Sequence, residues 1–179
     1  MLPIIAVAAQ KGGCGKSTLA HAFGSTLSRD HSVLLIDADP QMSLTRAVTI
    51  SSRWTLHDVL TRRCSMQDAV EPALPVFGQN LLVVAGSPLL ASLDAATASD
   101  LNRQYVLSDA LEGYCGATYT VIDCPAGIGL ATTMALVAAD IVITPVSTTP
   151  ACFETLGAFE LTIAQVQKRL NPRIRWFLA

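Results

Sequence analysis

The sequence is short of charged residues. Only 15% of its 179 residues are Asp, Glu, Lys or Arg, and only three are lysines: Lys11, Lys16 and Lys168. The formal net charge is −2, so the overall electrostatics do not indicate a nucleic-acid-binding protein, and any basic surface would have to be built from arginine. Hydrophobic residues make up 51%, which is typical of a compact α/β protein whose central strands are covered on both faces.

The sequence also lacks the segments that mark membrane, secreted and zinc-binding proteins. No apolar run approaches the roughly 18 residues that a membrane span requires. Residues 1–9 are apolar, but they carry no basic residue and no cleavage site and lead directly into glycines, so we interpret them as a buried strand rather than a signal peptide. The five cysteines form no C-x-x-C pair, which disfavours a disulfide framework or a structural zinc and fits a reducing cytoplasm. A cluster ligated across a dimer interface by a few cysteines from each chain stays open.

Short apolar runs alternate with helical patterns along the chain. Leu19, Phe23 and Leu27 are spaced four residues apart and predict a helix over 17–28. A second long helix is predicted over 153–170, and a short one near residues 54–60 within the irregular stretch 40–80. Strands are predicted at 4–9, 33–36, 81–85, 119–122, 141–144 and 174–178.

This alternation predicts the fold class. Short apolar strands separated by helices indicate an α/β protein with a mostly parallel sheet flanked by helices on both faces. We expect residues 1–179 to form a single domain. Because the chain stops inside the last predicted strand, at Ala179, we also expect this domain to be truncated at its C-terminus.

A glycine-rich loop follows the first predicted strand. Residues 10–18 read Gln-Lys-Gly-Gly-Cys-Gly-Lys-Ser-Thr, and Gln10 stands where the phosphate-loop pattern G-x-x-x-x-G-K-[ST] has its first glycine. Glycines let successive backbone N–H groups point at a phosphate, and the following helix presents its positive end to the same anion. Lys16 would reach the β- and γ-phosphates, and the Ser17 hydroxyl would hold Mg²⁺. The predicted nucleotide-binding residues are Lys11, Gly12, Gly13, Cys14, Gly15, Lys16, Ser17 and Thr18.

Aspartates follow two of the predicted strands. Asp37 and Asp39 come after the strand at 33–36, and Asp123 comes after the strand at 119–122. Ligands of parallel sheets lie beyond the carboxyl ends of the strands, so these carboxylates should share a site with the glycine loop. Asp123 fits a Walker B aspartate, and Asp37 is expected to support the Mg²⁺ shell. The alternative for all three, Asp37, Asp39 and Asp123, is an aspartate in a turn or helix cap. The predicted metal site consists of Ser17, Asp37 and Asp123, partly through water.

Lys11 makes the loop resemble that of a known group of enzymes. The pattern K-G-G-x-G-K-[ST] is the signature of the deviant Walker A P-loop ATPases, which this sequence resembles along nearly its whole length. The resemblance implies Mg²⁺-dependent ATP hydrolysis, with Lys11 crossing a dimer interface to the ATP of the partner subunit, much like an arginine finger. It also implies that Asp39 positions the attacking water. The implied catalytic residues are Lys11, Lys16 and Asp39.

Within this group, the sequence is similar to the ParA partition ATPases of the Soj-like, chromosomal type over about residues 3–178. The segments that carry the similarity are DADPQMSLT from Asp37, VIDCP from Val121, AAD from Ala138 and TPV from Thr144. The resemblance implies a homodimer that forms on ATP binding, non-specific binding to double-stranded DNA, and a ParB-like activator. It also implies a cytoplasmic, nucleoid-associated protein without stable membrane association that serves in chromosome or plasmid partition.

Departures from the ParA pattern leave two alternatives. Pro125-Ala126-Gly127-Ile128 resembles MinD, although MinD lacks the DPQ element, so the second interpretation is an ATPase that positions a septum, membrane or protein machine without binding DNA. The third is a nucleotide-binding fold without significant turnover, against which the intact lysines and aspartates argue. ParA proteins extend past the equivalent of Ala179, and that part usually contributes adenine contacts and much of the DNA-binding surface.

Overall fold

The chain folds around one mixed β-sheet. The structure is a computed structural model that describes residues 3–49, 51–77, 79–146 and 150–179, the first five of the last range by their backbone alone. Within these residues the sheet has seven strands, all parallel to their neighbours except β3, which runs antiparallel to β4. In order across the sheet, the strands are β3 (Val70–Pro72), β4 (Leu81–Val84), β2 (Val33–Asp37), β5 (Tyr119–Ala126), β1 (Ile4–Ala9), β6 (Ile141–Thr144) and β7 (Arg175–Leu178).

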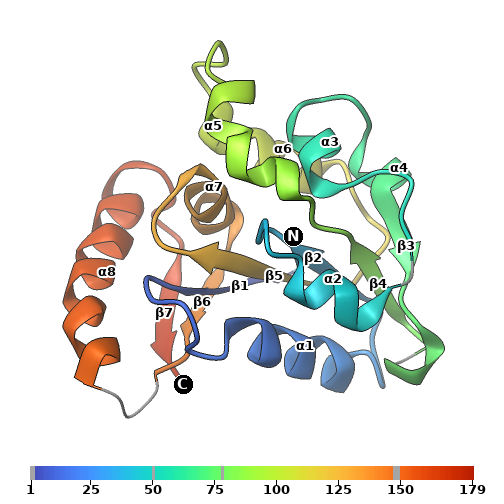
Figure 1. Cartoon of the computed structure of the whole chain (residues 1–179), viewed down its shortest axis with the longest axis horizontal. Helices are drawn as coiled ribbons and strands as arrows, with labels where there is room; N and C mark the ends of the chain where they lie inside the picture. Colours follow the sequence, from blue (N-terminus) through green and yellow to red (C-terminus); the bar gives the residue numbers. More distant parts are fainter. Residues whose placement is uncertain (1–2, 50, 78, 147–149) are drawn as a thin grey trace.

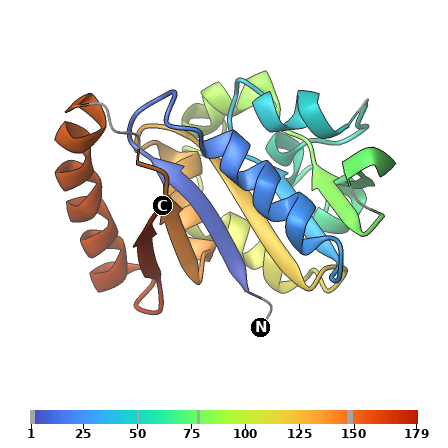
Figure 2. The same ribbon diagram turned by 90° about the horizontal axis from the view of Figure 1, so that it is seen from below.

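Helices cover both faces of this sheet (Figure 1). One face carries α1 (Lys16–Leu27) and α2 (Ser43–Val48), and Figure 2 shows α1 lying along the central strands. The other face carries α3 (Leu56–Leu60), α4 (Met66–Ala69), α5 (Leu93–Ala96), α6 (Val106–Glu112) and α7 (Leu130–Ala138). The long helix α8 (Pro150–Arg169) packs beside α7 at the β6–β7 edge, and none of the described helices is long and apolar enough to cross a membrane.

The side chains of the strands contribute to two separate hydrophobic cores, one on each face of the sheet. In β2, Leu34 and Ile36 pack toward the α7 side, whereas Val33 and Leu35 pack toward α1, and all four side chains are fully buried. Side chains alternate between the faces of a strand, so a strand covered on both sides must be apolar at every position. This explains why the central strands appear in the sequence as continuous apolar runs rather than as alternating patterns.

The structure confirms the predicted fold class and corrects several boundaries. β5 continues to Ala126, past the predicted end at residue 122, and its register against β1 shifts between Val7 and Ala9. β3 was not predicted, because it is three residues long, lies at the edge and ends at a proline. The α7 sequence LATTMALVA was not predicted either, because it is apolar on nearly all sides and shows no polar stripe.

Helix α1 approaches β2 closely at one glycine. A Cβ atom built on Gly24 would lie 2.6 Å from Leu35 Cδ2 and 2.9 Å from Leu35 Cγ. Such distances are shorter than real carbon contacts, so the absence of a side chain at Gly24 sets how tightly the helix packs on the sheet. This helix begins directly after the glycine loop, and its seating therefore positions that loop.

We expect Gly24→Ala to destabilise the fold by about 1–3 kcal/mol, because it overpacks this contact despite the better helix propensity of alanine. Gly157→Ala in α8 is the matched control, since a Cβ there meets nothing within 4 Å, and it should raise stability by up to about 1 kcal/mol. Urea unfolding of the two variants measures both effects. Shifts of the same sign would show that the close approach at Gly24 does not control packing.

Candidate functional site

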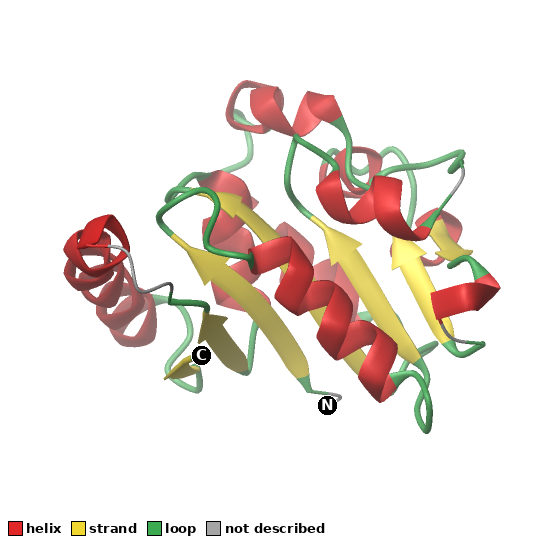
Figure 3. Cartoon of the chain, turned by 60° about the horizontal axis from the view of Figure 1, so that its bottom comes forward, coloured by secondary structure: helices red, strands yellow, loops and turns green. Residues whose placement is uncertain are grey.

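The carboxyl ends of three neighbouring strands bring the predicted site residues together. β1 lies between β5 and β6, and the glycine loop leaves it at Ala9. Val7 is paired in register with Asp123, and Asp123 is paired in turn with Asp37 on β2. The loop and both aspartates therefore share one edge of the sheet, where the strand arrows of Figure 3 end.

The glycine loop turns as a phosphate-binding loop must. Gly13 and Gly15 have φ values of 78° and 85°, in the left-handed region that favours glycine. A Cβ on either residue would meet nothing within 4 Å, so both lie on the open side of the turn. Gly15 is also the N-cap of α1 and supplies no side-chain cap, which leaves the first N–H groups of a twelve-residue helix available to an anion.

The two loop lysines lie in different environments. Lys16 is 6% exposed, and its Nζ donates a hydrogen bond to the carbonyl oxygen of Lys11 at 3.2 Å. The ammonium group is therefore held against the inner side of the loop, where a bound phosphate would compete for it. Lys11 is half-buried, and its side chain makes no ion pair with any residue that the structure describes.

Asp123 is the most unusual group at this edge. Its side chain is fully buried, and neither carboxylate oxygen accepts a hydrogen bond of good geometry from the described residues, although the Ser17 hydroxyl lies near enough to interact with it. Burial raises the pKa of Asp123 to about 7, with a smaller rise from Asp37 and Asp39 that the Ser17 hydroxyl and the Lys16 ammonium oppose. Buried carboxylates without partners are rare because desolvation is costly. A hard divalent cation between Asp123 and Ser17 would satisfy these oxygens, so the residues present fit Mg²⁺.

Asp37 is fully buried as well, but its oxygens are engaged. Oδ2 accepts hydrogen bonds from the Thr45 backbone N–H at 2.7 Å and from the Thr45 hydroxyl at 2.6 Å. Oδ1 accepts one from the Asp39 backbone N–H at 3.1 Å. Burial raises the pKa of Asp37, and the Thr45 hydrogen bonds oppose this rise. Participation of Asp37 in a Mg²⁺ shell stays a prediction, and its contacts give it a second task, which is to hold Thr45 and Asp39.

Asp39 forms a turn at the mouth of the site. Its Oδ1 accepts a hydrogen bond from the Gln41 N–H at 2.8 Å, and its carbonyl oxygen accepts one from the Met42 N–H at 2.9 Å. Asp39 therefore does cap a turn, as the alternative interpretation of this residue predicts. Its Oδ2 takes no hydrogen bond within the described chain, and the half-buried side chain can reach a water molecule. A catalytic role for Asp39 is compatible with this arrangement and stays a prediction.

Two residues beside the site were not singled out from the sequence. Thr45 and Gly86 both contact Asp37, and the Gly86 N–H donates a hydrogen bond to the Thr45 hydroxyl at 2.8 Å. Thr45 lies in the DADPQMSLT segment, but nothing in that segment indicates a bond to its hydroxyl. Gly86 follows β4, 41 residues further along the chain, and only the strand order brings it close.

The cysteines give no sign of a metal cluster within one chain. Among the residues described, no group of three or more His, Cys, Asp and Glu could hold a metal ion. Cys64, Cys115 and Cys124 are free thiols, and burial strongly raises the pKa of the Cys124 thiol. The side chain of Cys152 lies outside the described residues. The Mg²⁺ site predicted above uses a hydroxyl, carboxylate, phosphate and water, and does not depend on such a cluster.

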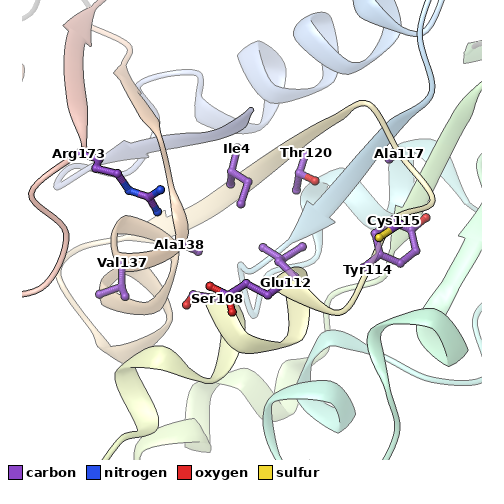
Figure 4. A pocket seen from close by; sticks show the side chains of 11 residues that line it. Ile4, Ser108, Glu112, Tyr114, Cys115, Ala117, Thr120, Val137, Ala138 and Arg173 are labelled. Atoms are coloured by element: carbon purple, nitrogen blue, oxygen red, sulfur yellow. The ribbon is translucent and has the colours of Figure 1, made fainter. Parts of the chain in front are cut away.

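Cavity volume alone does not locate this site. A cavity of about 540 Å³ lies at the opposite, amino-terminal edge of the sheet, near Ile4 at the start of β1 and Thr120 in the first residues of β5 (Figure 4). Glu112 and Arg173 enter it from different sides. The enclosed space beside the glycine loop is only about 10 Å³. The candidate nucleotide site is therefore an open edge built from backbone and charge rather than an enclosed pocket.

Comparisons with known proteins agree with this geometry. The model of the AAA domain family AAA_31 matches residues 2–176. Chromosome partitioning protein ParA of Caulobacter vibrioides is 36% identical over 181 residues, which cover 97% of this chain and 66% of the relative. Sporulation initiation inhibitor protein Soj of Bacillus subtilis is 33% identical over 173 residues, which cover 94% of this chain and 67% of the relative. The chain thus spans about two thirds of the length of these curated relatives.

A solved structure shares the fold closely. Cobyrinic acid a,c-diamide synthase of Mycobacterium smegmatis, with a bound ATP analogue and magnesium, superposes with a TM-score of 0.91 and 29% identity. The match covers 98% of this chain and 70% of that protein. The comparisons confirm the predicted P-loop fold and the predicted resemblance to ParA.

The buried Asp123 carboxylate should make stability depend on pH when metal is absent. The folded state binds this proton more tightly than the unfolded chain, so the contribution of Asp123 to the free energy of unfolding should be fully present below about pH 4 and be lost as pH rises through about 7. Asp123→Asn should flatten the profile and exceed the wild type by about 2–4 kcal/mol at pH 8. Urea unfolding in EDTA from pH 5 to 8 measures both proteins.

Asp30→Asn, at an exposed position after α1, is the control and should leave the wild-type pH profile unchanged. Parallel profiles for the wild type and Asp123→Asn would contradict the account of Asp123 as a buried, unpaired carboxylate.

Proposed function

We propose that this chain, which belongs to the AAA-domain family of ParA-type partition ATPases, is an ATP-driven switch for the partition of chromosomal or plasmid DNA. It would hydrolyse ATP with Mg²⁺ and dimerise when ATP is bound. The observation that carries the proposal is Asp123, a fully buried carboxylate without a partner beside Ser17 and Lys16. A protein is expected to retain such a costly group where a bound cation compensates for it.

The loop residues have distinct tasks in this proposal. The N–H groups of residues 12–18 bind the phosphates, together with the positive end of α1. The Lys16 ammonium leaves the Lys11 carbonyl and binds the β- and γ-phosphate oxygens. Ser17 and Asp123 hold Mg²⁺, with Asp37 supporting the shell. Bound Mg²⁺ would neutralise charge that develops on the phosphate oxygens. The M. smegmatis structure, crystallised with an ATP analogue and magnesium, supports this assignment.

Hydrolysis would require two further groups. Asp39 lies at the mouth of the site with one free carboxylate oxygen, where it can orient a water molecule for in-line attack. Lys11, half-buried and without an ion pair in the described chain, would reach the ATP of a second subunit and stabilise the transition-state charge. Because Lys11 acts across the interface, turnover depends on dimerisation.

Alanine substitutions separate these roles. Lys16→Ala should abolish ATP binding, whereas Lys11→Ala should bind ATP normally and lose dimer-dependent hydrolysis by about 10³-fold. Asp39→Ala should bind ATP and accumulate as a dimer that does not turn over. ATP affinity, sedimentation and phosphate release measure the three properties. Arg29→Ala, which removes an exposed positive charge after α1, is the control and should keep hydrolysis unchanged. Normal hydrolysis by Asp39→Ala would show that Asp39 is not catalytic.

The DNA-binding part of the proposal rests on the names of the relatives and on an exposed basic segment. Lys168 and Arg169 end α8, Arg173 lies in the segment that follows, Arg175 begins β7, and all four are exposed. Such residues can contact DNA phosphates without regard to sequence. A ParB-like protein would stimulate hydrolysis, and the ADP-bound monomer would leave the DNA. The protein would then be cytoplasmic and nucleoid-associated while ATP is bound.

Binding to a duplex of arbitrary sequence tests this part. We expect binding with ATP and Mg²⁺, much weaker binding with ADP or no nucleotide, and a steep loss of affinity with salt. Arg169→Ala with Arg175→Ala should reduce the salt dependence by up to about two ions. An ATP-dependent dimer that binds no DNA at any salt concentration would favour the MinD-like alternative, a switch that positions a septum, membrane or protein machine.

A further inference from the structure

Thr45 lies at the centre of a buried hydrogen-bond network next to the site. Its hydroxyl donates to Asp37 Oδ2 at 2.6 Å and accepts from the Gly86 N–H at 2.8 Å. Its backbone N–H donates to the same Asp37 oxygen at 2.7 Å. Asp37, Thr45 and Gly86 are all buried, so water cannot replace these bonds without opening the structure. One hydroxyl thus joins the end of β2, the first turn of α2 and the segment after β4.

The network reaches Asp39 through the other oxygen of the same carboxylate. Asp37 Oδ1 accepts a hydrogen bond from the Asp39 N–H at 3.1 Å, while the Ala38 N–H is held by the carbonyl oxygen of Asp123 at 2.9 Å. A carboxylate that is fixed on one side by two bonds to Thr45 can fix the backbone of Asp39 on the other. Thr45 therefore acts on Asp39 without touching it.

Gly86 also packs closely against the backbone of residues 37–39. A Cβ at Gly86 would lie 3.1 Å from Asp37 Cγ, 3.1 Å from the Asp37 carbonyl oxygen and 3.2 Å from the Asp39 carbonyl oxygen. The segment after β4 therefore packs flat against residues 37–39 and leaves no room for a side chain. This steric contact acts in addition to the hydrogen bond between the Gly86 N–H and the Thr45 hydroxyl, and both constrain the same three residues.

The turn after Asp39 also requires support. Met42 has a φ of 57°, a left-handed conformation that is unfavourable for a non-glycine residue. It is the N-cap of α2 and supplies no side-chain cap, so the Asp37 carboxylate takes that place by accepting the Thr45 N–H. The network thereby anchors the helix that follows the turn, and the turn carries Asp39.

We propose that Thr45 is a positioning residue that fixes Asp39 for ATP hydrolysis, through the Asp37 carboxylate and with Gly86 as its second anchor. The inference rests on the proposed catalytic role of Asp39. It gives Asp37 a task that needs no metal, because both of its oxygens already hold protein groups. A misplacement of about 1 Å in a catalytic group can reduce turnover by about 10²-fold while ATP binding through the glycine loop is preserved.

Conservative variants at Thr45 test the inference. Thr45→Val removes the hydroxyl at nearly constant volume, Thr45→Ser retains it, and Thr49→Val at the C-cap of the same helix is the matched control outside the network. Hydrogen–deuterium exchange of a peptide covering residues 38–46 is measured first, in the whole chain without nucleotide. We expect at least about tenfold faster exchange in Thr45→Val and wild-type exchange in Thr45→Ser and Thr49→Val, because a lost buried bond of about 1.4 kcal/mol corresponds to tenfold.

Steady-state hydrolysis is the second readout. Thr45→Val should lower kcat about 10- to 100-fold, with KM for ATP and the Mg²⁺ dependence changed less than about threefold, and Thr45→Ser should restore kcat. Gly86→Ala should lower kcat in the same way without removing any hydrogen-bonding group. If Thr45→Val does not fold, kcat of Gly86→Ala tests whether the position of Asp39 controls turnover. Equal losses in kcat and in ATP or Mg²⁺ affinity would overturn the inference, since Thr45 would then support binding.

The two readouts separate this inference from the proposed function. If the wild type hydrolyses no ATP, the proposed function fails, and exchange alone decides whether Thr45 holds the Asp39 segment. Unchanged exchange in Thr45→Val overturns the inference even when ATP turnover by the wild type is normal.

Discussion

A carboxylate buried without a partner is the constraint on which the rest of the site depends. Asp123 lies between β1 and β2 in the middle of the sheet, where water does not reach it. Its ionised form is destabilised by burial and by two neighbouring aspartates, and only the Ser17 hydroxyl and Lys16 act in the other direction. The folded chain therefore has an excess of negative potential at one point. In the proposed function a bound cation would neutralise that excess, and it would couple folding to nucleotide binding at this residue.

The neighbouring aspartates show how environment assigns different tasks to the same side chain. Asp37 is as deeply buried as Asp123, yet three donors satisfy its oxygens, so it organises the surrounding protein. Asp39 lies nearer the surface and uses one oxygen for its own turn, which leaves the other free. One carboxylate is thus available for a cation, one anchors local structure and one can reach water. The parallel strands place all three at a single edge because their carboxyl ends coincide.

Much of this arrangement is predictable from sequence because it depends on local patterns. Continuous apolar strands, the glycine loop and aspartates at strand ends are each recognised from a few consecutive residues, so the fold class and the edge of the sheet that carries the candidate site could be predicted. The roles assigned from resemblance to Lys11 and Asp39 stay predictions. Thr45 and Gly86 could not be found in the same way, since 41 residues separate them and their contact follows from the strand order. Helix α7 was missed for a related reason, because burial on nearly all sides removes the polar stripe that marks a surface helix.

The affinity of the purified chain for ATP, measured by calorimetry with Mg²⁺ and with EDTA, tests most directly whether Asp123 is the cation site. Binding should be at least about tenfold tighter with Mg²⁺, and Asp123→Asn should lose that difference while retaining the weaker, metal-independent binding through the glycine loop. Equal affinity with and without Mg²⁺ in the wild type, or an undiminished Mg²⁺ effect in Asp123→Asn, would contradict the claim that the buried carboxylate is the cation site.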